Sequence, residues 1–159
     1  MCYSQLRGKR SEKLKLEMQL VEGDLVDAIE VSHNIPEFDS PYAQEEYEKR
    51  LDDSSLILTV EIDDKPIGFK VGYDRFGDGS FYSWMGGVLP DHRQNKVASI
   101  LATYQEEWVK SNGYQSIKLK TRNKHEPMIA FSIARGFDII DSELNKDLRE
   151  MRIWMEKIL

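Results

Sequence analysis

The sequence predicts an α+β fold in which a mixed, mostly antiparallel sheet of about six to seven strands is flanked by about four helices. Two observations lead to this prediction. Three runs of alternating apolar and polar residues follow one another between residues 55 and 89, separated only by short turns, which is typical of an antiparallel meander. After residue 90 the apolar residues recur with the period of a helix, and another strand pattern follows. The late part of the chain is therefore expected to contain a βαβ unit.

The first part of the domain is expected to hold one strand and two helices. Alternation over 16–20 indicates the strand. A helix is then expected to begin after Asp24, whose carboxylate can cap it, and to end before Pro36. A second helix, over 41–52, is so strongly charged that most of its surface is expected to face water.

The remaining elements follow from the same two periods. The meander strands are expected at 55–63, 67–74 and 80–89. The next helix is amphipathic, runs for about four turns and stops at Asn112-Gly113, with apolar residues at Val97, Ile100, Leu101, Tyr104 and Trp108. The last elements are expected to be a strand over 115–121, a helix over 127–134, a strand over 137–140 and a strand around 151–155.

Composition limits the class of protein. The chain has 159 residues, which suits one domain over 14–159 preceded by a loose arm over 1–13. A net charge of −6 disfavours nucleic acid and mildly favours cationic substrates. No apolar run approaches the roughly 18–20 residues of a membrane helix, and the one cysteine, Cys2, cannot form an internal disulfide. We therefore expect a cytoplasmic protein without a membrane partner, and an exposed sheet edge would allow a homodimer.

Residues 86–101 are the segment most suited to binding a ligand. A strand ends here, a turn containing Pro90 follows, and a helix begins without an obvious side-chain cap. The first backbone N–H groups of such a helix lack partners, and the positive end of the helix dipole lies behind them. A pyrophosphate could be held by the backbone N–H groups of 94–98, with charge from Arg93 and Lys96 and a hydroxyl from Ser99.

The same segment resembles the acetyl-CoA motif of the GNAT superfamily of N-acetyltransferases, Val-x-Pro-x-x-Arg-x-x-Gly-x-Gly/Ala. The chain matches it at Val88, Pro90, Arg93 and Ala98, and Gly136-Phe137 resembles a later family segment. The resemblance runs from about residue 16 to 157. It implies a GNAT-like fold and transfer of an acetyl group from acetyl-CoA to a primary amine of a small molecule or a peptide. The amine is expected to attack the thioester directly in a ternary complex, without a metal.

Carrying the motif over assigns the cofactor site residue by residue. The assigned residues are Gly86, Gly87, Val88, Arg93, Gln94, Asn95, Lys96, Val97, Ala98, Ser99 and Asn123. Lys96 stands where the family usually has glycine, and Ser132 stands where many members have the tyrosine that protonates the leaving thiolate. Tyr82, Trp84 and Ser132 are the candidates for a catalytic role.

Several alternatives stay open at this point. Gly86-Gly87 indicates either a bulge or a close ligand, and the aromatic residues Tyr82 and Trp84 suit either core packing or an acceptor pocket. A general base could come from His33, Glu37, Asp39 or Asp74. Glu37, Phe38 and Asp39 would suit a cationic amine. The alternative function is a GNAT-fold module that binds acyl-CoA for sensing or assembly with little catalysis.

Overall fold

The computed structural model describes residues 18–93 and 96–159, so the arm expected at 1–13 lies outside the described residues. The strands are Met18–Glu22 (β1), Leu56–Ile62 (β2), Lys65–Tyr73 (β3), Ser80–Val88 (β4), Ser116–Arg122 (β5), Asp138–Glu143 (β6) and Arg152–Ile158 (β7). The helices are Leu25–His33 (α2), Gln44–Arg50 (α3), Val97–Ser111 (α4) and Glu126–Ala134 (α5), with short 3₁₀ turns at Pro90–His92 (η1) and Leu148–Glu150 (η2).

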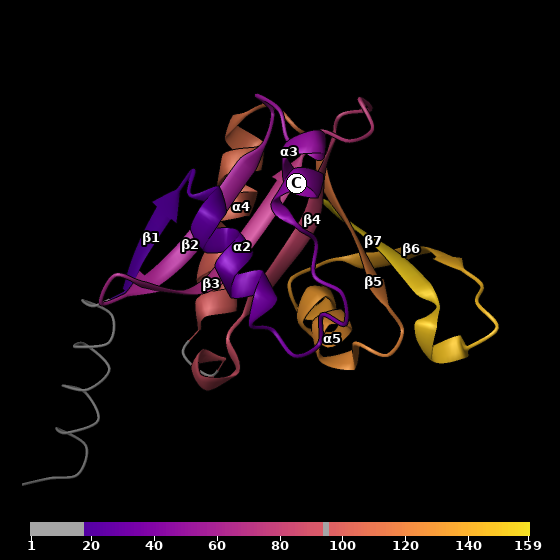
Figure 1. Ribbon diagram of the computed structural model, residues 1–159. Coiled ribbons are helices and arrows are strands. Elements are labelled where there is room, and N and C mark those ends of the chain that lie inside the picture. Colours follow the sequence, from indigo (N-terminus) through magenta and orange to yellow (C-terminus); the bar gives the residue numbers. More distant parts are fainter. Residues whose placement is uncertain (1–17, 94–95) are drawn as a thin grey trace, which may run out of the picture.

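Seven strands of the described chain form one sheet in the order β1-β2-β3-β4-β5-β7-β6 (Figure 1). All neighbouring strands are antiparallel except β4 and β5, which are parallel and are joined through α4. The α+β class, the meander and the late βαβ unit are thus confirmed. β1, at Met18–Glu22, overlaps the expected strand at 18–20 and extends beyond it, whereas residues 16 and 17 of that expectation lie outside the described residues.

The sheet separates two hydrophobic clusters. On one face α4 packs Val97, Leu101 and Val109 against Phe81 and other strand residues, and α5 adds to this cluster. On the other face α2 and α3 cover the strands β2 to β4, where the rings of the aromatic residues gather. We call these the α4 face and the α2 face. None of the helices in the described ranges combines the length and apolarity of a membrane span.

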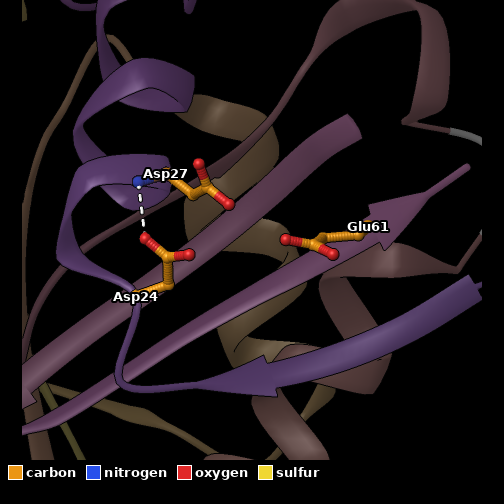
Figure 2. A group of neighbouring side chains, drawn as sticks. All are labelled: Asp24, Asp27 and Glu61. Carbon is orange, nitrogen blue, oxygen red and sulfur yellow. Dashed lines mark hydrogen bonds between the residues drawn. The ribbon is translucent and has the colours of Figure 1, made fainter. Parts of the chain in front are cut away.

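The start of α2 carries a cluster of three carboxylates (Figure 2). Asp24 caps the helix as expected, because its Oδ1 accepts a hydrogen bond of 3.0 Å from the N–H of Asp27. Glu61 of β2 completes the cluster, in which one oxygen from each residue lies within 4.8 Å of the others. Burial raises the pKa of Glu61, and the neighbouring carboxyl groups of Asp27 and Asp24 raise it further.

Glu61→Gln should therefore stabilise the protein at neutral pH. Since the folded state raises the pKa of Glu61, the charged carboxylate opposes folding above that pKa, and the penalty disappears as pH falls through it. Removing one charge from such a cluster is worth about 0.5 kcal/mol, or a melting temperature about 1–2 °C higher. Thermal unfolding at pH 7 and at pH 4 measures this, with Glu107→Gln on an exposed part of α4 as control. An equal gain at both pH values would contradict the explanation.

Candidate functional site

The parallel strands β4 and β5 pair over only part of their length. Pairing runs from Ser80 with Ser116 to Ser83 with Leu119. Beyond this point β4 continues beside β3 as far as Val88, and β5 continues beside β7. The backbone edges of β4 and β5 that face each other are therefore unpaired at their carboxyl ends. We call this region the splay, and it is where a βαβ unit is expected to bind ligands.

A β-bulge lies at the beginning of the splay. Gly72 of β3 pairs with Ser83, whereas Val71 pairs with Met85, so that Trp84 is the extra residue of β4. A bulge at Gly86-Gly87 was one of the two alternatives from the sequence, and its predicted position is wrong. The bulge reverses which side chains face which side of the sheet, because it adds one residue to a period of two.

The two glycines after the bulge each leave room for a neighbour. A Cβ atom on Gly87 would overlap the Cδ1 atom of Ile35 on the α2 face. A Cβ atom on Gly86 would lie 3.4 Å from Cγ and 3.7 Å from Nζ of Lys70, so the lysine side chain runs beneath Gly86 toward the splay on the α4 face. These positions therefore allow close packing on both sides of the open strand edge.

The turn into α4 has a left-handed residue at the position of the family glycine. Lys96, at the place of the family glycine, has φ 61° and ψ 16°, which is the left-handed conformation that glycine adopts without strain. Its side chain is exposed. Among the described residues α4 has no side-chain cap, so no side chain caps the N–H groups of its first turn, at Val97 to Ser99. Gln94 and Asn95, also assigned to the cofactor, lie outside the described residues.

Arg93 pairs with a carboxylate in this structure. Its guanidinium donates two hydrogen bonds to Glu37, of 2.6 and 2.7 Å, and its Nε donates to the carbonyl oxygen of Val88 at 3.1 Å. The hydrogen bonds from Arg93 lower the pKa of Glu37. Glu37 is accordingly a poor general base while this ion pair is intact, and Arg93 must leave it to meet a phosphate.

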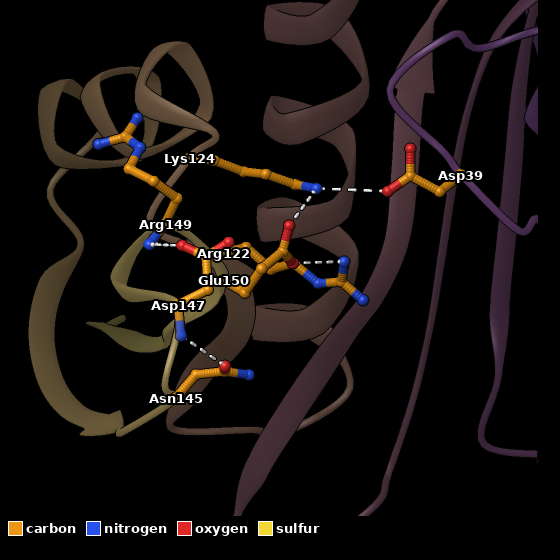
Figure 3. A network of polar contacts seen from close by, with 7 residues as sticks. All are labelled: Asp39, Arg122, Lys124, Asn145, Asp147, Arg149 and Glu150. Carbon is orange, nitrogen blue, oxygen red and sulfur yellow. Dashed lines mark hydrogen bonds and ion pairs between the residues drawn. The ribbon is translucent and has the colours of Figure 1, made fainter.

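A second ion-pair network lies across the splay (Figure 3). Lys124, just after β5, contacts Asp39 at 3.3 Å and Glu150 at 2.6 Å, and Arg122 contacts Glu150 at 2.8 Å. The loop between α2 and α3 is thus tied to the end of β4 through Glu37 and to the end of β5 through Asp39. Both acids of this loop are neutralised by cations of the chain.

The three catalytic candidates are all buried. The hydroxyl of Ser132 donates a 2.9 Å hydrogen bond to the carbonyl oxygen of Met128, one turn earlier in α5, and only 2% of the residue is exposed. Tyr82 and Trp84 lie in the aromatic cluster of the α2 face, where the Trp84 and Tyr47 ring centroids are 4.8 Å apart. Burial raises the pKa of Tyr82, which makes it a weaker acid. These surroundings match the core-packing alternative.

Asn123 also has partners within the fold. Its side-chain amide donates to the carbonyl oxygen of Leu148 at 3.1 Å, and its backbone N–H donates to that of Met151. Asn123 therefore holds η2 against the end of β5. The other base candidates are similarly engaged: His33 Nε2 contacts the carbonyl oxygen of Tyr42 at 3.1 Å, and Asp74 accepts from the N–H of Gly77.

Three titratable residues that sequence reasoning missed lie around the splay. Burial, followed by the charge of Arg135, lowers the pKa of Lys70 to about 8. Burial, followed by the charges of Lys124 and Arg122, lowers the pKa of His125 at the start of α5. Lys120, the first residue of β5 beyond the paired stretch, also has its pKa lowered by burial. The sequence does contain a signal for Lys70 and Lys120. Each is a charged residue within a strand whose neighbours lead one to expect partial burial.

Comparison with known proteins agrees with this geometry. The model of the acetyltransferase (GNAT) family matches residues 23–137. The chain belongs to this family. No curated protein matches the sequence significantly.

Solved structures share the GNAT fold with this chain. Ard1 from Thermoplasma volcanium has a TM-score of 0.78 at 18% identity, over 90% of this chain and 98% of the other. The ribosomal-protein-S18-alanine N-acetyltransferase from Escherichia coli has a TM-score of 0.76 at 14% identity, over 89% and 93%. An aminoglycoside 6′-N-acetyltransferase complexed with coenzyme A has a TM-score of 0.73 at 18% identity, over 88% and 96%.

Lys96→Gly should stabilise the GNAT domain. A left-handed conformation costs a residue with a Cβ atom about 1–2 kcal/mol, and the greater freedom of glycine in the unfolded chain offsets part of the gain. We expect about 0.5–1 kcal/mol by urea denaturation. The matched control is Lys110→Gly in the last turn of α4, where the backbone is right-handed and the same replacement should destabilise by about 0.5–1 kcal/mol. Destabilisation by both variants would contradict the assigned backbone at Lys96.

Proposed function

We propose that this GNAT protein transfers the acetyl group of acetyl-CoA to a primary amine, which attacks the thioester directly in a ternary complex. The observation that carries the proposal is the splay of β4 and β5 beside an uncapped helix N-terminus. Lys96 holds the turn from β4 into α4 in a left-handed conformation, which glycine adopts without strain. The coenzyme A in one structural neighbour supports the choice of cofactor.

The chain offers two kinds of contact for acetyl-CoA. N–H groups of the first turn of α4 would hold the pyrophosphate, since they lie at the positive end of the helix dipole. The free backbone edge of β4 at Gly86 to Val88 would pair with the amide groups of the pantetheine arm and polarise the thioester carbonyl. Arg93 would exchange Glu37 for phosphate.

Transfer also requires a proton acceptor and a proton donor. His125 is half-buried, and its lowered pKa keeps the imidazole neutral at pH 7, so it is suited to take the proton of the amine. Ser132 is not suited to protonate the thiolate, because its hydroxyl already donates to Met128. Lys70 is the better donor, because its side chain runs beneath Gly86 on the α4 face, where the cofactor would lie.

The direct experiment combines binding and turnover. Calorimetry with acetyl-CoA measures binding, and release of free thiol across a panel of amines measures transfer. Binding with thiol release that depends on the amine supports the proposal. Binding without release for any amine would support the acyl-CoA-binding module instead. Neither binding nor release would reject both functions.

Arg93→Gln should weaken acetyl-CoA binding about tenfold, because the variant loses a charge-assisted contact to phosphate. Glu37→Gln should act in the opposite direction, since it releases Arg93 from its ion pair. Dissociation constants from calorimetry measure both effects, and Arg149→Gln, which breaks the exposed ion pair with Glu126, is the control. An Arg93→Gln variant with unchanged affinity would remove Arg93 from the site.

Lys70→Met should lower kcat roughly a hundredfold while the affinity for acetyl-CoA stays within about twofold. A lysine that donates a proton must be charged, so wild-type kcat should decline as pH rises through the Lys70 pKa of about 8. The variant should lose this decline. A pH profile of kcat from 6.5 to 9.5 measures it. An unchanged profile in the variant would exclude Lys70 as the donor.

A further inference from the structure

The two faces of the splay are chemically different. The α4 face holds the N-terminus of the helix expected to bind the cofactor. The amine must therefore reach the thioester from the α2 face. Helices α2 and α3 cover this face over β2 to β4, while β5 and β7 extend beyond them (Figure 1). Beside these helices Phe76 and Trp154 form an aromatic wall backed by the buried ring of Tyr82, with ring centroids 5.8–5.9 Å apart.

Three cations contact this wall: Lys118, whose ammonium nitrogen lies 5.0 Å from the Phe76 centroid, Arg75 and Lys120. The guanidinium carbon of Arg75 lies 4.9 Å from the ring centroid of Tyr82 and 5.8 Å from that of Trp154. The ammonium nitrogen of Lys120 lies 5.0 Å from the Trp154 centroid. Arg75 and Lys120 thus share one aromatic ring although their charges repel each other.

Neither Arg75 nor Lys120 has a carboxylate partner within 4.0 Å among residues 18–93 and 96–159. The neighbouring cations differ in this respect. Lys118 pairs with Asp78 at 2.9 Å, and Arg152 pairs with Glu143 at 3.6 Å. Burial lowers the pKa of Lys120, and the charges of Arg152 and Arg75 add to the effect. Two neighbouring cations without carboxylate partners favour an anion brought by a ligand.

Lys120 also stands at the right place in the strand. Leu119 is the last residue of β5 that pairs with β4, and its side chain belongs to the cluster on the α4 face. Lys120 is the next residue, so it points to the α2 face where the splay begins. A group bound by Lys120 and Arg75 would lie beside the path of the amine toward the thioester.

We infer that the acceptor is an amine that also carries a carboxylate, which Arg75 and Lys120 bind against the aromatic wall. This inference rests on the proposed transfer reaction and specifies its substrate class. It narrows the expectation of a cationic amine, which the net charge of −6 and the residues Glu37, Phe38 and Asp39 favoured. Both acids of that group are paired with cations of the chain.

The test uses acceptors that differ only in the carboxylate. Phenylalanine is compared with phenylalaninamide, and a dipeptide beginning with aspartate with the same dipeptide beginning with asparagine. The first pair represents free amino acids, and the second represents acidic peptide termini. In at least one pair, kcat/KM should be about tenfold higher for the carboxylate member. The amide of phenylalanine has the more acidic ammonium group, so it supplies more neutral amine, and preference for the acid cannot arise from amine protonation.

Lys120→Gln and Arg75→Gln should each remove this preference, mainly through KM of the carboxylate acceptor. Lys118→Gln is the matched control, because Lys118 lies on the same strand and face but already has Asp78 as partner. Equal kcat/KM within both pairs, or a preference that survives both variants, would overturn the inference and leave the transferase function intact.

Binding of 3-phenylpropionate, which has the carboxylate but no amine, separates this inference from the proposed function. Calorimetry should detect binding to the wild type and at least tenfold weaker binding to Lys120→Gln. This result is expected whether or not turnover occurs. Absence of binding to the wild type would reject the carboxylate site, whereas absence of acetyl-CoA binding and of thiol release would reject the transferase.

Discussion

The parallel contact between β4 and β5 ends at Leu119, and the rest of the site depends on that ending. Trp84 is an extra residue in β4 immediately beyond the last pair, and a bulge of this kind bends a strand and increases its twist. β5 meanwhile keeps full pairing with β7. The backbone groups that lose their partners lie in the middle of a sheet rather than at its edge. A ligand with its own amide groups is the chemically appropriate replacement for the missing strand pairing.

Charge around the splay is distributed in two ways. Cations near the entrance, at Arg93 and Lys124, are paired with acids of the loop between α2 and α3. Cations deeper in the splay, at Lys70 and Lys120, have no such partners among the described residues, and burial lowers the pKa of both. Exposed ion pairs such as those of Arg93 and Lys124 contribute little to stability, so a ligand can replace the carboxylate at low cost in free energy. The unpaired ammonium groups of Lys70 and Lys120 would be stabilised more by an anionic group of a ligand.

Periodicity predicted the elements well because each strand and α4 bury one face against the sheet or a helix. The cap of α2 at Asp24 and the end of α4 at Asn112-Gly113 needed only local information. The bulge at Trp84 could not be predicted, since it depends on the register against Val71 and Gly72 of another strand. The pairing of Arg93 with Glu37 joins residues 56 positions apart and is equally invisible to local patterns. A lysine on an alternating strand is read as facing solvent, and for this reason Lys70 and Lys120 were missed.

The ion pair between Arg93 and Glu37 makes anion binding at the turn an exchange reaction. A phosphate that takes the guanidinium releases a carboxylate into water, where that carboxylate gathers a cation from the solution. The counterions released from the phosphate are then partly balanced by the cation that Glu37 takes up. The affinity for the phosphate-containing ligand should therefore depend only weakly on ionic strength. The same exchange detaches the loop between α2 and α3 from the end of β4. The loop is then held by its ion pair between Asp39 and Lys124 at the end of β5, so that occupancy of the turn changes how the loop is anchored.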